Sequence, residues 1–267
     1  SLARLARFHV LRPCVDLDLL KPDWPAPARV RAYATTRAGG VSQGLYAGLN
    51  LASHVGDAPA AVMYNRALLA DRLQRTPLWL QQVHGVAVAD ADVDPPETEA
   101  DAAVARHAGK VCTVMTADCL PVLFCDRTAT VVGAAHAGWR GLAGGVLENT
   151  VRAMTVPGEE ILAWLGPAIA QTAFEVGDEV RTAFLAHDPQ ASEAFRPGMA
   201  AGKWQADLYA LARRRLAAIG VRQVFGGGRC TFAESGHFFS ARRDGTLSGR
   251  QASLIWLDHD ETLRGRE

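Results

Sequence analysis

Short apolar runs that contain many β-branched residues recur along the chain and predict its strands. The clearest runs cover residues 30–36, 77–91, 110–126, 130–139, 160–169 and 251–257. Runs of this kind, bounded by glycine, proline or polar clusters, are typical of buried strands. The pattern therefore predicts a β-sheet protein, although it gives no order for the strands.

Three segments between these runs show the spacing of apolar residues that is typical of a helix. Residues 57–74 begin with Asp57 as a candidate N-cap and have Pro59 in the first turn. Residues 140–154 follow an apolar run directly, and residues 207–220 end at Gly220, a natural C-terminal cap. Because strands dominate early and the helices are irregularly spaced, we expect a mixed α/β protein rather than a regular doubly wound fold.

Composition and charge narrow the classes of protein to which this chain could belong. A chain of 267 residues with 49% hydrophobic residues is long enough to bury a large core. Its 28 Lys and Arg equal its 28 Asp and Glu, so it has no basic excess for nucleic-acid phosphates. No apolar stretch reaches the roughly 20 residues that cross a bilayer. We expect no nucleic-acid or membrane partner, while small anionic ligands stay open.

The cysteines and the N-terminal residues favour a cytoplasmic location. The five cysteines are widely spaced in a chain too large to depend on disulfides. Residues 1–13 are mildly basic and amphipathic, without the apolar core or cleavage site of a signal peptide. We therefore expect reduced thiols, of which Cys14, Cys112 and Cys125 have structural roles.

Three polar side chains interrupt apolar runs beside a glycine or proline that turns the chain. They are His84 in LQQVHG, Cys119 in TADCLP and His136 in AAHAGWRG. Two imidazoles and one thiolate suit a catalytic zinc site, which uses three protein ligands and leaves a position open. Their separations match no zinc finger, so the fold would have to assemble the site. For each residue alone, an ordinary buried side chain is the alternative.

The same residues also allow a cysteine nucleophile. Cys119 would attack, with His136 as its base and Asp118 or His84 as the orienting group. Both interpretations need a lowered thiol pKa, so the sequence does not separate them. Asp118 is also a candidate acid or base, although neighbouring strand residues point to opposite faces and a structural role is the alternative.

Two further segments have the character of anion-binding sites. The stretch TTRAGGVSQG (35–44) joins an arginine to glycines whose backbone N–H groups could surround a phosphate, although a glycine-rich hairpin is the alternative. The stretch FFSARRDGTLSGR (238–250) gathers arginines around a turn, for which a solvated hairpin is the alternative. The loop at 138–145 lacks the G-x-G-x-x-G pattern of dinucleotide sites. The residues expected to contact substrate or phosphate are Arg37, Asn50, Arg242 and Arg243.

Taken together, these segments resemble the YfiH-like, laccase-domain proteins. The blocks that carry the resemblance occur in order: TTRAGGVSQG, QQVHG, TADCLPVLFCD, AAHAGWRG, LGPAIAQTAFEVGDEV, and CTFAE with HFFSARRDGTLSGR. They run from about residue 30 to residue 257, which is nearly the whole chain. Proteins of this family were once described as multicopper polyphenol oxidases and are now regarded as zinc-dependent purine nucleoside phosphorylases.

The resemblance implies a single domain over residues 1–267, of layered α/β/β/α type with mixed sheets. It also implies a zinc site formed by His84, Cys119 and His136. The implied activity is phosphorolysis of adenosine, and of inosine, guanosine or methylthioadenosine, accompanied by adenosine deamination. The partners would be purine nucleosides and phosphate, and we expect a monomer or weak homo-oligomer.

Three alternatives stay open beside this function. One is a cysteine hydrolase that uses Cys119 and His136, and another is a non-catalytic protein that binds nucleosides or metal. The third is a copper-dependent polyphenol oxidase. Copper is less favoured than zinc, because the eight scattered histidines contain no H-x-H pair from which to build several copper centres.

Overall fold

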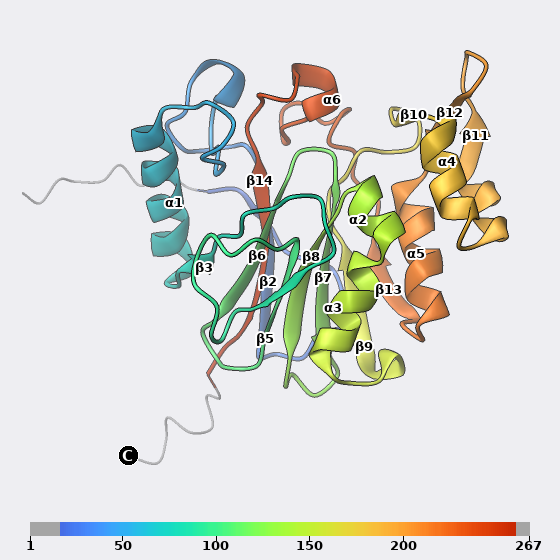
Figure 1. The fold of residues 1–267 in the computed structure, drawn as a ribbon. Helices are drawn as coiled ribbons and strands as arrows, with labels where there is room; N and C mark the ends of the chain where they lie inside the picture. Colours follow the sequence, from blue (N-terminus) through green and yellow to red (C-terminus); the bar gives the residue numbers. More distant parts are fainter. Residues whose placement is uncertain (1–16, 260–267) are drawn as a thin grey trace, which may run out of the picture.

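Two mixed β-sheets packed face to face form the centre of the molecule in the computed structural model, which describes residues 17–259 (Figure 1). The N-terminal stretch 1–13 and Cys14 lie outside the described residues. In the first sheet β14 pairs antiparallel with β2 and β6, and β3 pairs parallel with β6. In order, this sheet consists of β1 (Leu19–Leu20), β2 (Val30–Thr35), β14 (Gln251–Leu257), β6 (Val111–Thr116) and β3 (Pro77–Leu78).

The second sheet is built around β7, which pairs antiparallel with β8 on one side and β9 on the other. Its edges are parallel pairs, β13 with β9 and β4 with β5. In order, it consists of β13 (Gln223–Gly226), β9 (Ile161–Leu165), β7 (Leu120–Asp126), β8 (Val132–Ala137), β5 (Ala102–Ala105) and β4 (Val88–Asp90). A small separate sheet has the order β10 (Glu175–Gly177), β12 (Lys203–Ala206) and β11 (Phe195–Pro197).

Strand β7 is buried on both of its faces. Leu123 and Cys125 belong to the core between the two large sheets, whereas Val122 and Phe124 belong to the core under the helices. Successive side chains of a strand point to opposite faces, so a strand covered on both sides needs apolar residues at every position. This burial explains the continuous apolar run of β7. It also confirms the structural interpretation of Cys125.

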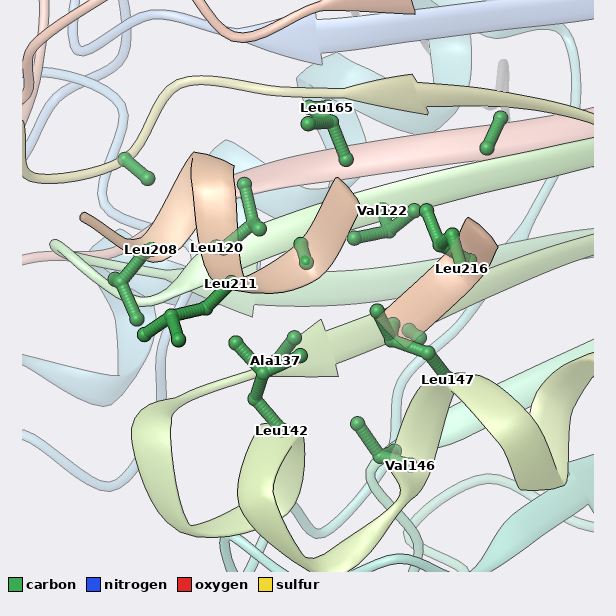
Figure 2. Close-up of a cluster of buried hydrophobic side chains, with 14 of the residues drawn as sticks. Leu120, Val122, Ala137, Leu142, Val146, Leu147, Leu165, Leu208, Leu211 and Leu216 are labelled. Carbon is green, nitrogen blue, oxygen red and sulfur yellow. The ribbon is translucent and has the colours of Figure 1, made fainter. Parts of the chain in front are cut away.

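Helices cover the outer face of each sheet and complete four layers (Figure 1). Helix α1 (Pro59–Leu73) covers the first sheet, where Leu69 packs in a core with Trp256 of β14. Leucines of α5 pack with α2, α3 and β7 over the second sheet (Figure 2). The other elements are α2 (Trp139–Gly144), α3 (Val146–Met154), α4 (Asp178–Leu185), α5 (Leu208–Ala218), α6 (Ala241–Asp244) and the 3₁₀ turns Gly44–Tyr46, Gly158–Glu160 and Pro189–Ala194. The expected α/β/β/α layering with mixed sheets is confirmed.

Two of the expected strands are in fact pairs of strands. The run 77–91 divides into β3 and β4, with a loop that contains His84 between them. The run 110–126 divides into β6 and β7, which belong to different sheets. The apolar pattern hides this second break because both strands border the same core, and only Asp118, with φ of 87°, marks the turn. The prediction of single long strands was therefore wrong at both places.

The expected helices need smaller corrections. Residues 140–154 form two helices, because Gly145 adopts φ of 101° between them. The N-cap of α1 is Ala58 and not Asp57, whose carboxylate instead accepts hydrogen bonds from Ser42 Oγ and Asn50 Nδ2. Helix α5 ends as expected, with Gly220 following it at φ of 84°.

Two general properties follow for residues 17–259. The four cysteines in this part of the chain are all free thiols. Its helices are too short or too polar for any of them to cross a membrane.

Candidate metal centre

The fold brings His84, Cys119 and His136 together, as the sequence predicted. His84 lies in the β3–β4 loop, Cys119 directly precedes β7, and His136 lies near the end of β8. Because β7 and β8 are antiparallel, the start of β7 lies beside the end of β8, with Leu120 opposite Ala137. The Cys119 Sγ and His84 Nε2 atoms are 4.0 Å apart, and the two imidazole centroids are 4.8 Å apart. The three residues offer donor atoms that all lie within 4.8 Å of one another.

A buried carboxylate, that of Asp101, fixes both histidines. The His136 Nδ1 atom donates to Asp101 Oδ1 at 2.8 Å, so Nε2 is the ring nitrogen left for the site, and a metal would bind it after it loses its proton. The backbone N–H of His84 donates to the same oxygen at 2.9 Å. The N–H groups of Val83 and Gly85 donate to Oδ2 at 3.1 and 2.6 Å. These bonds hold the loop in which His84 adopts a left-handed φ of 62°.

Asp101 was not predicted from the sequence. The one signal it offered was an acidic residue directly before the apolar strand β5. A carboxylate at the end of a strand is usually solvated, and its burial here comes from partners elsewhere in the chain, including His136.

The donor set and the space around it fit a zinc ion. Tetrahedral zinc, with bonds of about 2.1 Å to nitrogen and about 2.3 Å to sulfur, holds nitrogen and sulfur ligands roughly 3.6 Å apart. The Cys119 Sγ and His84 Nε2 atoms are 4.0 Å apart and the whole set lies within 4.8 Å, so a small inward movement of the side chains would close the site on the ion. Gly138 leaves the space open, since a Cβ atom there would lie 3.0 Å from Cys119 Sγ and 3.7 Å from His136 Nε2. Within residues 17–259, this is the one group of three such side chains that could hold a metal ion.

The thiol and the imidazole of this centre have shifted pKa values. Burial alone would raise the pKa of Cys119, but the neighbouring His136 and His84 lower it to about 6. Burial alone would lower the pKa of His136, but Cys119 and Asp101 raise it to about 9. A thiolate is therefore favoured near neutral pH, as either a metal ligand or a nucleophile requires. In contrast, burial raises the pKa of Cys125 to about 12.

His84, Cys119 and His136, called the triad below, line a cavity of about 320 Å³, a size suited to a small molecule. Gln82 lies on its wall and is fixed by two hydrogen bonds with the backbone of Met115. A larger hollow of about 610 Å³ beside α5 has no such group of metal-ligand side chains among the described residues. The other residues that line the cavity are His54, Met115, Thr116, Ala117, Ala241, Thr246 and Arg250.

The four expected substrate or phosphate contacts are not among the residues that line this cavity. The Arg37 guanidinium donates to the carbonyls of Ala47 and Ser235 and lies over the Phe239 ring, 4.6 Å from its centroid. The guanidinium of Arg243 pairs with Asp244 and also donates to three backbone carbonyls. Most of the N–H donors of these two guanidinium groups are therefore used to hold loops together.

Asn50 and Arg242 are also engaged within the protein. The Asn50 side chain is fully buried, donates to Asp57 Oδ2 and accepts from the backbone N–H of Arg250. The Arg242 guanidinium donates to the Ala173 carbonyl at 3.2 Å. Contact of these two residues, or of Arg37 and Arg243, with substrate stays a prediction.

The carboxylate of Asp118 holds together the segment that carries α6. It accepts hydrogen bonds from Thr231 Oγ1 at 2.6 Å, from Ser240 Oγ at 3.0 Å and from the backbone N–H of Arg242 at 2.6 Å. Although Asp118 neighbours Cys119, these bonds favour the structural alternative for it over an acid or base.

Comparison with known proteins identifies the family of this site. The sequence model of the family described as multi-copper polyphenol oxidoreductase laccase matches residues 31–258. Purine nucleoside phosphorylase PA4543 of Pseudomonas aeruginosa is 58% identical over 239 residues, which cover 89% of this chain and 98% of that protein. Purine nucleoside phosphorylase YfiH of Escherichia coli is 54% identical over 242 residues, with coverages of 90% and 98%.

A solved structure agrees with these sequence relatives. Protein NMB0706 of Neisseria meningitidis superposes with a TM-score of 0.88 at 54% identity, over 90% of this chain and 99% of that one. The chain therefore belongs to the multi-copper polyphenol oxidoreductase laccase family, in which it resembles YfiH-type proteins throughout the layers that position the metal centre.

Proposed function

We propose that the protein is a purine nucleoside phosphorylase that acts in the cavity beside His84, Cys119 and His136. The observation that carries the proposal is a triad of converging metal-ligand atoms at the wall of a cavity of about 320 Å³. A relative that is 58% identical bears the name purine nucleoside phosphorylase, which supports the same activity here.

The reaction sets clear requirements for the site. In phosphorolysis, an oxygen of inorganic phosphate uses its electron pair to bond to C1′ of the ribose while the C1′–N9 bond breaks. The electron pair of that bond leaves with the purine, which takes up a proton, and the products are ribose 1-phosphate and the free base. Positive charge develops on the sugar and negative charge on the base, so the site needs an anion-binding group and an electrophile on different sides.

The chain supplies the framework for this chemistry. His84, Cys119 and His136 would hold zinc, which when bound supplies a Lewis acid within the cavity. Asp101 holds the Nδ1–H group of His136, which leaves Nε2 as the nitrogen available to the metal, and Gly138 keeps the space free of side-chain atoms.

Zinc is our proposal for the metal in preference to copper. The family description refers to several copper ions, whereas residues 17–259 offer one group of three metal-binding side chains. A multicopper oxidase needs additional histidine-rich centres for its electron transfer.

The finer parts of the function are also proposals. We propose adenosine as a substrate, with inosine, guanosine and methylthioadenosine as others, and adenosine deamination as an accompanying reaction in the same cavity. Deamination would replace the 6-amino group with oxygen from water and release ammonia. A cytoplasmic location, a single domain and a monomeric or weakly oligomeric state complete the proposal.

Product analysis tests the reaction type. Zinc-loaded protein is incubated with adenosine and phosphate, and the products are separated by chromatography. Adenine with an equal amount of ribose 1-phosphate supports phosphorolysis, and inosine supports deamination. Free ribose formed without phosphate dependence, by metal-free protein that a thiol reagent inactivates, would instead favour the cysteine hydrolase that uses Cys119 and His136.

Variants connect the activity to the triad. His84→Ala and Cys119→Ser each remove one ligand atom, so we expect loss of bound zinc together with loss of adenine release. Cys230→Ser is the matched control, because Cys230 is a free thiol that does not line the cavity. Full activity of the two ligand variants would contradict the proposal.

A further inference from the structure

Arg250 is the one lysine or arginine among the residues that line the cavity of the triad. Its neighbours on that wall include His54 and Thr246, and the described residues form no ion pair between Arg250 and a carboxylate. Burial lowers the pKa of its guanidinium, while negative charge on Cys119 and Asp118 raises it. A half-buried cation without a carboxylate partner faces the space in which substrate would bind.

The hydrogen bonds of Arg250 leave one edge of its guanidinium available. The Nη1 atom donates to the carbonyls of Ser248 and Gly249 at 2.6 and 3.0 Å, and Nη2 donates to the Thr246 carbonyl at 2.9 Å. A guanidinium has five N–H donors, so the Nε donor and one Nη2 donor are left without a partner among the described residues. Nε and Nη2 share one edge of the planar group, and an edge of this kind binds two oxygens of a phosphate or carboxylate.

The position of this edge is fixed before any ligand arrives. The backbone N–H of Arg250 donates to Asn50 Oδ1 at 3.0 Å, and its carbonyl accepts from the N–H of Leu51 at 3.2 Å. Arg250 directly precedes β14, so its backbone is also joined to the first sheet. Asn50, which was predicted to touch the ligand, therefore positions the residue that faces the cavity.

We propose that Arg250 is the binding residue for the phosphate co-substrate, through the Nε edge of its guanidinium. This inference rests on the proposed phosphorylase function, which requires an anion beside the ribose. Arg37 and Arg243 are weaker candidates, because neither lines the cavity and the guanidinium of Arg243 also pairs with Asp244. The competing explanation is that Arg250 neutralises the charge of the Cys119 thiolate. A bound divalent ion would neutralise that charge itself, so the thiolate would not need Arg250 as a counter-ion.

Direct phosphate binding tests the inference. Inorganic phosphate is titrated into zinc-loaded protein without nucleoside, with ³¹P NMR or calorimetry as the readout, and phosphate and adenosine KM values are then measured. Arg250→Gln removes the two-donor edge, and we expect phosphate affinity to fall about 10- to 100-fold, as for loss of a charge-assisted bidentate pair. The adenosine KM is expected to change by less than about 3-fold.

Two further variants keep the test decisive. Arg213→Gln is the matched control, because Arg213 also donates to backbone carbonyls, those of Val224 and Gly226, but does not line the cavity. Arg250→Lys keeps the charge without the planar edge, so its loss of phosphate affinity should be smaller but still exceed that of the control. If Arg250→Gln fails to fold, as judged by its melting temperature, the lysine variant carries the comparison.

The outcomes separate this inference from the phosphorylase proposal. Phosphate that binds the unaltered protein but not Arg250→Gln supports the inference even if no purine is released. Purine release with an unchanged phosphate KM in Arg250→Gln overturns the inference while the phosphorylase function stands. Equal loss of zinc, phosphate and adenosine affinity in a folded Arg250→Gln variant also overturns it, because that result indicates a counter-ion for the thiolate.

Discussion

Replacing Asp101 with asparagine should weaken the metal centre without removing any metal ligand. The fully buried carboxylate accepts four N–H groups, two on each oxygen: His136 Nδ1 and the His84 backbone on Oδ1, and the Val83 and Gly85 backbones on Oδ2. Asparagine has nearly the same shape but offers one acceptor oxygen and one NH₂ donor. In either orientation, its NH₂ group faces two of these donors.

The expected magnitude follows from the number of lost acceptors. A buried donor that loses its acceptor costs about 1–3 kcal/mol, so two of them cost about 2–6 kcal/mol in the free energy of unfolding. Removing the hydrogen-bond partner of a metal-binding histidine typically lowers metal affinity about 10- to 100-fold. If the NH₂ group faces His136, the Nδ1 proton moves to Nε2 and the ring loses the lone pair that a metal needs.

Zinc affinity and stability are measured separately to test this prediction. Competition with a chromophoric chelator gives the zinc affinity of the folded protein, and denaturant titration of the metal-free protein gives its stability. Asp126→Asn is the matched control, because Asp126 is also a buried carboxylate, with hydrogen bonds from Thr130 and Val131. It ends β7 roughly 20 Å from the end beside Cys119, at about 3.3 Å per residue.

We expect both variants to lose stability and only Asp101→Asn to lose zinc affinity. If zinc affinity changes by the same factor in the two variants, Asp101 does not orient the centre. That result would refute the reasoning.

Two other predictions follow from single positions. Gly138→Ala places a methyl group 3.0 Å from Cys119 Sγ and 3.1 Å from His84 Cδ2, so metal analysis should find little bound zinc, whereas Gly236→Ala, with no atom within 4 Å of its new Cβ, should bind zinc normally. Burial alone would raise the pKa of Asp126, but hydrogen bonds from Thr128, Val131 and Thr130 lower it below its usual value. Its contribution to stability is therefore present above about pH 4 and is lost as the pH falls through the folded-state pKa, so the difference in unfolding free energy between the unaltered protein and Asp126→Asn should shrink on acidification.

Each of these predictions has a clear contrary result. The Gly138 backbone has φ of −62°, which suits alanine, so a folded Gly138→Ala protein with full zinc content would show that the space is not used by the metal. For Asp126, a difference in unfolding free energy that is constant from about pH 6 to about pH 2 would show that its carboxylate has the same pKa in the folded and unfolded states.

The spacing of apolar residues along the chain correctly predicted the elements in which the buried side chains follow a regular pattern. Strand β14 has the predicted bounds because its seven residues are all buried, and α5 ends where Gly220 permits the turn. The break between β6 and β7 could not be predicted, because the core between the sheets makes both strands equally apolar. The short strands β10, β11 and β12 have three or four residues with mixed exposure, too few to show a period.

The candidate site was predictable where a polar residue interrupts an apolar stretch of sequence. His84, Cys119 and His136 stand out because each interrupts an apolar run, and the fold brings them together. The arginines were harder to interpret, because a sequence shows charge but not partners. Arg37 and Arg250 both lie in glycine-rich segments and both donate to loop carbonyls, but only Arg250 lines the cavity.

The most direct test of the central claim is a zinc titration of metal-free protein during the phosphorylase assay. The claim is that His84, Cys119 and His136 hold the metal that phosphorolysis requires. We predict that phosphate-dependent release of adenine from adenosine rises with added zinc and reaches a plateau at one ion per chain, with ribose 1-phosphate formed in equal amount. Full activity without metal, or a plateau of zinc binding with no release of adenine, would contradict the account.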